Sequence, residues 1–130
     1  MFHGQCHCGA IQYEMPENIL YHTLCHCTDC RRHSGAPLVG WAAVHTDELR
    51  VSGTAKIYKS SQNGRRHFCS ECGTGLFYTN EEILPGITDV ASGTLDDPDR
   101  LPPQAHIQAA ERLAWMRDIS ALPEFARYPD

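Results

Sequence analysis

Short alternations of hydrophobic and polar residues run along most of the chain and predict β-strands rather than long helices. Ile11, Tyr13 and Met15 occupy every second position of residues 10–15, which is typical of a strand with one buried face. The most apolar run, residues 38–45, predicts a buried strand. The same criteria give further strands at residues 19–24, 49–52, 55–59, 66–69, 75–79 and 87–91.

Helical signals are confined to two places. Thr28 is positioned to cap a single helical turn that Gly35 ends. After Pro102 and Pro103, residues 105–109 predict a last strand, or residues 109–116 one or two helical turns. We expect the remaining tail to pack on the body as an irregular strap. The pattern as a whole predicts a mainly β fold.

The composition limits the class of protein. The chain has 130 residues, 42% of them hydrophobic, and we expect one domain over residues 1–130. Its formal net charge of −5 argues against nucleic acid or an anionic membrane as a partner. We see no run long enough to span a bilayer and no export signal, and therefore expect a cytoplasmic protein.

All seven cysteines fall into three clusters with the spacing of metal ligands: Cys6-x-Cys8, Cys25-His26-Cys27-x-x-Cys30 and Cys69-x-x-Cys72. In a reducing compartment such thiolates serve metals rather than disulfides. The first and third clusters are each followed by a glycine, which permits the positive φ of a tight turn. Together these two pairs predict a closed, structural four-thiolate zinc site.

The trio Cys25, Cys27 and Cys30 predicts a second zinc site of a different kind. Three thiolates leave one coordination position open, as catalytic zinc sites do. The centre then carries a net charge of −1 and favours one more soft ligand, such as a thiolate. A thiol bound there would lose its proton and be held as a nucleophile. In the alternative interpretation, His26 is the fourth ligand and closes the site.

Two cations follow the trio directly. Arg31 and Arg32 are placed to lower the pKa values of the cysteines or to receive a substrate carboxylate; the alternative is a solvated turn, which explains Arg32 equally well. Arg65 and Arg66 have the same alternatives with a weaker claim. We expect Trp41 and the later Trp115 to be core residues.

Three longer motifs extend these clusters: Gly4-x-Cys6-x-Cys8-Gly9-x-Ile11-x-Tyr13, Cys25-His26-Cys27-x-x-Cys30-Arg31-x-x-Ser34-Gly35-Ala36-Pro37 and Phe68-Cys69-x-x-Cys72-Gly73-x-x-Leu76. Together they resemble the glutathione-dependent formaldehyde-activating enzyme family, which includes centromere protein V. The resemblance implies an Mss4-like fold of antiparallel sheets clamped by zinc. It also implies that the structural zinc is held by Cys6, Cys8, Cys69 and Cys72. The catalytic zinc would be held by Cys25, Cys27 and Cys30.

The activity that names this family combines glutathione with formaldehyde to give S-(hydroxymethyl)glutathione, a carbon–sulfur lyase reaction. We therefore expect a zinc-dependent lyase whose partner is a small anionic thiol such as glutathione, with its carboxylate toward Arg31 and Arg32. The alternatives are a non-catalytic, zinc-stabilised binding module and a thiol redox protein that uses the cysteine trio directly. Two zinc ions per chain would favour the enzyme.

Overall fold

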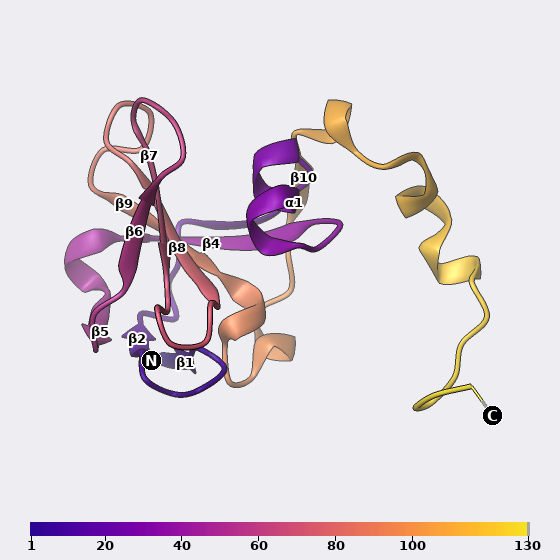
Figure 1. Ribbon diagram of the computed structural model, residues 1–130, viewed down its shortest axis with the longest axis horizontal. Helices are drawn as coiled ribbons and strands as arrows, with labels where there is room; N and C mark the ends of the chain where they lie inside the picture. The colour runs from indigo at the N-terminus through magenta and orange to yellow at the C-terminus, as the bar shows by residue number, and fades with distance from the viewer. Residues whose placement is uncertain (130) are drawn as a thin grey trace.

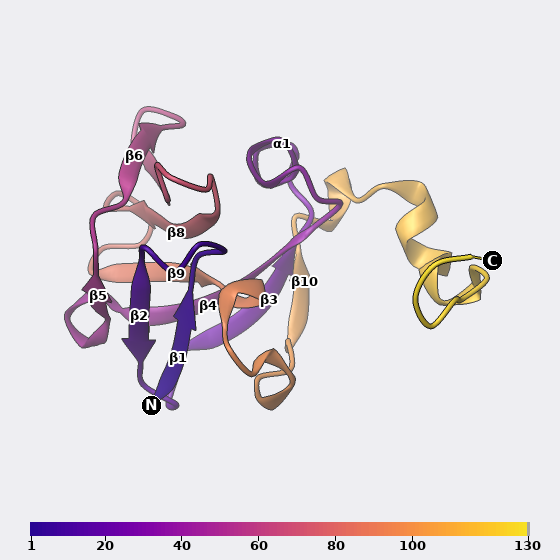
Figure 2. The ribbon, with the colours of Figure 1, turned by 60° about the horizontal axis from the view of Figure 1, so that its bottom comes forward.

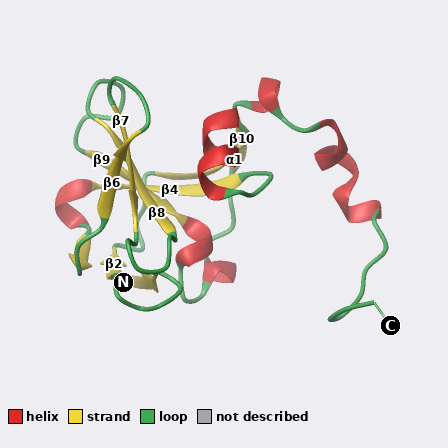
Figure 3. Ribbon diagram, in the orientation of Figure 1, coloured by secondary structure: helices red, strands yellow, loops and turns green. Residues whose placement is uncertain are grey.

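Two β-sheets and one short α-helix form the body of the protein in the computed structural model, which describes residues 1–129 (Figures 1 and 3). The smaller, antiparallel sheet has the order β1-β2-β5, with β1 (Phe2–Gln5), β2 (Gln12–Met15) and β5 (Arg50–Ser52). The larger sheet has the order β10-β3-β4-β9-β8-β7-β6. Its strands are β3 (Tyr21–Cys25), β4 (Val39–His45), β6 (Lys56–Lys59), β7 (Gly64–Phe68), β8 (Gly75–Asn80), β9 (Ile87–Ala91) and β10 (Ala105–Ile107).

These strands confirm the mainly β fold and every strand that the hydrophobic pattern predicts before residue 92. The pattern missed β1, and the last strand, β10, pairs with β3 in parallel, whereas all other pairs are antiparallel. Short 3₁₀ segments complete the chain: η1 (Thr46–Glu48), η2 (Ser92–Thr94), η3 (Pro98–Arg100), η4 (Ala109–Glu111) and η5 (Ala114–Ala121). None of the helices within residues 1–129 is long and apolar enough to cross a membrane.

Helix α1 (Thr28–Ser34), the one α-helix within residues 1–129, begins inside the second cysteine cluster. Its N-cap is Cys27, whose Sγ accepts a hydrogen bond from the amide of Cys30 at 3.2 Å, so the predicted cap at Thr28 is wrong by one residue. Gly35 ends the helix as predicted, with a φ of 70° and its amide donating to the carbonyl of Arg31 at 2.7 Å. Cys27, a member of the cluster, therefore fixes the start of the helix, and Gly35 fixes its end.

The buried side chains form two separate groups. The main core lies between the two sheets and includes Ile11, Met15, Val44, Leu76 and Val90, each at most 2% exposed. A smaller group forms around α1 on the larger sheet; its buried members are Cys25, Cys30, Trp41 and Ala91. Trp41 is a core residue, as predicted, and it belongs to the group that surrounds the second cysteine cluster.

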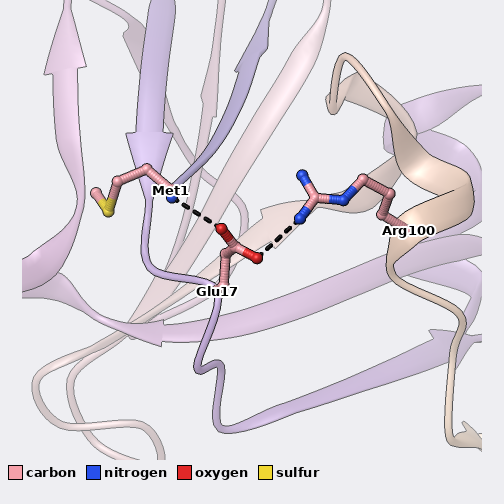
Figure 4. A network of polar contacts seen from close by, with 3 residues as sticks. All are labelled: Met1, Glu17 and Arg100. Atoms are coloured by element: carbon pink, nitrogen blue, oxygen red, sulfur yellow. Dashed lines mark hydrogen bonds and ion pairs between the residues drawn. The ribbon is translucent and has the colours of Figure 1, made fainter.

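The N-terminus is tied to two distant segments by Glu17, as Figure 4 shows. One carboxylate oxygen of Glu17 accepts from the N-terminal ammonium of Met1 at 3.0 Å, and the other accepts from Arg100 at 2.8 Å. The Arg100 guanidinium also lies over the ring of Phe2, 4.9 Å from its centroid. Because these charged groups are about half exposed, solvent screens both ion pairs, and we expect them to add little to the stability of the fold.

After β10 the chain contacts α1 once more through Glu111 in η4, and beyond residue 113 it leaves the body as an arm, coloured orange to yellow in Figures 1 and 2. The expected strap on the body is therefore wrong. Trp115 is 55% exposed, so its predicted place in the core is also wrong, and Leu122 and Phe125 are similarly exposed. The backbone hydrogen bonds within the arm are local, such as that from Met116 to Leu113.

Candidate metal centres

Two tight turns bring together the four cysteines of the predicted structural site. Cys6 and Cys8 lie in the turn between β1 and β2, and Cys69 and Cys72 lie in the turn between β7 and β8. Their four Sγ atoms all lie within 4.8 Å of one another. The Sγ of Cys8 is 3.7 Å from the Sγ of Cys6 and also 3.7 Å from that of Cys69. A tetrahedral site with Zn–S bonds of about 2.3 Å requires Sγ–Sγ distances of about 3.8 Å, so the donor set fits one zinc ion.

Backbone hydrogen bonds shape both turns. The amide of Gly9 donates to the carbonyl of Cys6, and that of Gly73 to the carbonyl of Cys69, and both glycines have the positive φ that the sequence predicts. The amide of Ile11 points at the Sγ of Cys6 at 3.3 Å. These backbone hydrogen bonds hold the thiols of both turns toward the same point.

Thr74 links the two turns. Its hydroxyl accepts a hydrogen bond from the amide of His7 at 3.0 Å, across a separation of 67 residues. The same hydroxyl contacts the Sγ of Cys72 at 3.2 Å, and hydrogen bonding from Thr74 lowers the pKa of Cys72 to about 5. Cys6 and Cys69 are 1% exposed and belong to the main core, so a metal here would clamp the core at its edge.

The second cluster lies at the junction of β3 and α1. Cys25 ends β3, Cys27 caps α1 and Cys30 lies within α1, and their three Sγ atoms are within 4.8 Å of one another. The Sγ atoms of Cys25 and Cys30 are 3.6 Å apart, close to the spacing that a shared tetrahedral metal requires. Among residues 1–129, no histidine, cysteine or carboxylate completes this group as a fourth donor.

His26 does not point toward its neighbouring thiols. Its side chain is fully buried, and its Nε2 lies 2.8 Å from the Nδ1 of His106 on β10. The backbone amide of His26 donates to the carbonyl of Ile107. The arrangement therefore does not favour the alternative in which His26 closes the site, and instead holds β10 against the start of α1.

Three donors converge on Cys30. Its Sγ accepts from the indole Nε1 of Trp41 at 3.4 Å and lies 3.7 and 3.8 Å from the two terminal nitrogens of Arg66. The neighbouring thiol of Cys25, with smaller contributions from Cys27, Trp41 and Arg66 in that order, lowers the pKa of Cys30 to about 5 although burial opposes this. The pKa of Cys25 is raised in turn, chiefly by Cys30. The cluster is thus prepared to carry negative charge on Cys30.

Arg66 is the residue whose importance the sequence did not reveal. Strand alternation places Arg65 and Arg66 on opposite faces of β7, but only the register of the sheet decides which of them faces α1. Arg66 lies opposite Tyr78 on β8, and Tyr78 lies opposite Asp89 on β9, so these three side chains share the face that α1 covers. The Arg66 guanidinium lies over the Tyr78 ring, 4.9 Å from its centroid.

Arg31 and Arg32, the two cations expected to face a substrate, have different surroundings. Arg31 donates to the hydroxyl of Thr28 at 3.2 Å, and that hydroxyl donates to a carboxylate oxygen of Glu111 at 2.8 Å. Arg32 is exposed and, within residues 1–129, forms no ion pair. Arg32 is therefore the freer of the two for a ligand.

A cleft separates α1 from β6, and Arg32 and Arg66 both line it. We call it the α1–β6 cleft; it comprises a hollow of about 380 Å³ and an adjoining, more apolar hollow of about 440 Å³. Their walls are Asp29, Arg32, His33, Lys56, Ile57, Tyr58, Ser60, Arg66, Phe68 and Gly73. His33 and Tyr58 belong to both hollows, and their rings are parallel to within 4° at a centroid distance of 6.2 Å. The cleft thus leads from the surface to the arginine that contacts Cys30.

Asp89 is a buried carboxyl on the same sheet face. It is 8% exposed, and its Oδ1 has no hydrogen-bond partner within the described chain. Burial, and secondarily the charge of Cys30, raises the pKa of Asp89 to about 6 from its ordinary value of 3.8. This carboxyl therefore changes charge close to neutral pH.

Comparison with known proteins identifies a family and several relatives. Residues 1–111 match the family described as glutathione-dependent formaldehyde-activating enzyme. A Halomonas elongata protein whose name assigns it to these enzymes is 28% identical over 144 residues, which cover 100% of this chain and 90% of that protein. An uncharacterized lyase of Schizosaccharomyces pombe is 30% identical over 81 residues, covering 61% of this chain and 59% of the relative. A crystal structure of a Rhodobacter sphaeroides protein matches with a TM-score of 0.62 and 25% identity, over 80% of this chain and 98% of that one.

Proposed function

This chain belongs to the glutathione-dependent formaldehyde-activating enzyme family, and on that premise we propose that it is a zinc-dependent enzyme joining a small anionic thiol to formaldehyde or a related small carbonyl. The thiol is glutathione or a relative, and the reverse reaction is that of a carbon–sulfur lyase. One observation carries the proposal: three thiols converge on one point, without a fourth protein ligand among residues 1–129, beside a cleft lined by two arginines.

Each cysteine cluster has its own part in this proposal. Cys6, Cys8, Cys69 and Cys72 would hold a structural zinc, and Cys25, Cys27 and Cys30 would hold the catalytic one. Zinc at the trio would supply a Lewis acid that favours the thiolate form of a substrate. We also propose residues 1–130 as a single zinc-binding domain, since the first cluster joins residue 6 to residue 72. A cytoplasmic location stays a prediction.

The remaining residues would bind and orient the substrate. Arg32 would receive a substrate carboxylate at the mouth of the α1–β6 cleft, and Arg66 would neutralise charge at the sulfur end. The substrate sulfur attacks the carbonyl carbon of formaldehyde, and an S–C bond forms as the C=O π bond breaks. The resulting oxygen takes a proton from solvent, which balances the proton that the thiol loses on binding.

Metal quantification with and without glutathione tests the proposal. We expect two zinc ions per chain, and we expect glutathione to protect one of them from a chelator. The rate of S-(hydroxymethyl)glutathione formation should exceed the uncatalysed rate measured without protein. One zinc per chain, or no rate above the background, would refute the enzymatic assignment.

The distance between two thiols favours one second candidate, a thiol redox protein. The Sγ atoms of Cys25 and Cys30, at 3.6 Å, need only a small movement to form a disulfide. Oxidation of the zinc-loaded protein distinguishes the two functions. An enzyme of the proposed kind keeps its trio reduced while zinc is bound, whereas a redox protein forms the Cys25–Cys30 disulfide reversibly.

A further inference from the structure

The guanidinium of Arg66 is buried beside the second cysteine cluster without a carboxylate partner. Arg66 is 5% exposed and forms no ion pair with any carboxylate in residues 1–129. Its Nε has no hydrogen-bond partner there. Its polar contacts are those of its two terminal nitrogens to the Sγ of Cys30, and its planar face lies on the ring of Tyr78.

An isolated buried cation of this kind is costly unless an anion compensates it. Removing an arginine from water carries a large desolvation penalty, and a buried charge that loses its partner is left uncompensated. Cys30 is the anion that the geometry offers, since Trp41 and Arg66 both direct N–H groups to its sulfur. The burial of Arg66 therefore depends on negative charge in the trio.

We propose that Arg66 is a positioning residue that acts as the counter-cation of the trio and makes its fourth position selective for an anionic sulfur ligand. The inference rests on the proposed function insofar as the trio holds zinc. Three thiolates with one Zn²⁺ carry a charge of −1, and a fourth thiolate raises this to −2, whereas a neutral ligand leaves it unchanged. A fixed guanidinium therefore stabilises the thiolate-bound form more than a form with a neutral ligand.

Arg65 supplies the matched control. It is the neighbouring residue on the same strand and carries the same charge, but its guanidinium donates to the backbone carbonyls of Ser61, Gln62 and Gly64. Arg65→Met removes one positive charge from β7 without touching the cluster. Arg66→Met removes the charge at the thiols, and Arg66→Lys keeps a charge there but loses the fork of two donors.

The experiment compares two small ligands at the trio after Co²⁺ has replaced zinc, with binding followed by the sulfur-to-cobalt absorption bands. The ligands are 2-mercaptoethanol, which binds as a thiolate and carries no carboxylate, and imidazole, which binds as a neutral ring. In Arg66→Met, we expect thiolate affinity to fall about 10- to 100-fold, because no guanidinium then offsets the negative charge that the thiolate adds, with a change of less than about threefold for imidazole. Arg65→Met should leave both affinities at the wild-type level.

The Lys variant keeps the test decisive if Arg66→Met does not fold. Arg66→Lys should retain a preference for the thiolate within about tenfold of wild type, because the charge remains. Equal loss for both ligands, or the same loss in Arg65→Met, overturns the inference. If the ligand preference follows Arg66 while glutathione and formaldehyde give no rate above background, the proposed function fails and this inference stands.

Discussion

The Sγ of Cys8 lies 3.7 Å from the Sγ of Cys69, although 61 residues separate them in the chain. The contact joins the β1–β2 turn of the small sheet to the β7–β8 turn of the large one. Cys6 and Cys69 are also members of the main core, and their sulfur atoms lie within one group with those of the other two cysteines. The first cysteine cluster therefore connects the two sheets at the edge of the main hydrophobic core.

Replacing Cys69 by serine should unfold or insolubilise the protein. A structural zinc contributes on the order of 10 kcal/mol to folding, which exceeds the stability of a typical small domain. Thermal unfolding followed by circular dichroism, together with zinc content, measures the effect. The exposed neighbour Ser70 provides a control as Ser70→Ala, which should melt like wild type. A soluble Cys69→Ser protein with unchanged melting would show that the first cluster holds no structural metal.

Cys27→Ser should abolish activity while leaving the fold and the first zinc in place. The serine hydroxyl accepts hydrogen bonds at helix N-caps as well as any side chain, so α1 should keep its cap from residue 27. We expect the free energy of unfolding to change by less than about 1 kcal/mol apart from the lost metal. Zinc quantification should give one ion per chain instead of two. Loss of both ions would mean that the two sites are not independent.

Features that depend on neighbouring residues could be predicted from the sequence, whereas features that depend on contacts between distant residues could not. The cysteine spacings and Gly35 are local features, and the structure has the thiols in two groups and ends α1 as expected. Strand β1 was missed because its inward position 4 is a glycine, which gives no hydrophobic signal. A side chain there would collide with the ring of Tyr13. Buried and exposed positions therefore alternate along β1, but the hydrophobic pattern of the sequence does not show it.

Arg66 and the C-terminal arm could not be predicted for a different reason. The position of Arg66 under α1 depends on the register between β7 and β8, which includes a shift at His67 and Phe68. Such a shift exchanges the faces of a strand, and no local pattern encodes it. The apolar residues of the arm, such as Leu122 and Phe125, suggested burial, but they are about 60% exposed. Hydrophobicity alone did not specify a contact with the body.

Asp89 should make the free energy of unfolding depend on pH between about 4 and 6. Its pKa is raised to about 6 in the folded chain, so the folded state binds the proton more tightly than the unfolded state does. The stability that this carboxyl contributes is therefore full below about pH 4 and falls as the pH rises to about 6. One pH unit of displacement is worth about 1.4 kcal/mol, so the total loss is roughly 3 kcal/mol.

Asp89→Asn tests this dependence directly. The amide stays neutral, so the variant should be more stable than wild type at pH 7, and the difference should disappear near pH 4. Denaturant unfolding at both pH values, with the zinc load held constant, measures the difference. A variant that is equally destabilised at the two pH values would show that Asp89 acts through packing rather than through its charge.

Arg32→Ala should weaken glutathione binding by about 1–2 kcal/mol if a charge-assisted hydrogen bond to a carboxylate is lost. Arg32 lines the α1–β6 cleft with Arg66 and forms no ion pair with any other side chain of residues 1–129. Arg31→Ala is the informative comparison, because Arg31 donates to Thr28 beside Glu111 and should affect melting more than binding. Calorimetry of the zinc-loaded variants with glutathione and with 2-mercaptoethanol separates the carboxylate from the sulfur. Equal weakening of both thiols by Arg32→Ala would place the contribution of Arg32 at the sulfur end of the site and remove its role as the carboxylate receptor.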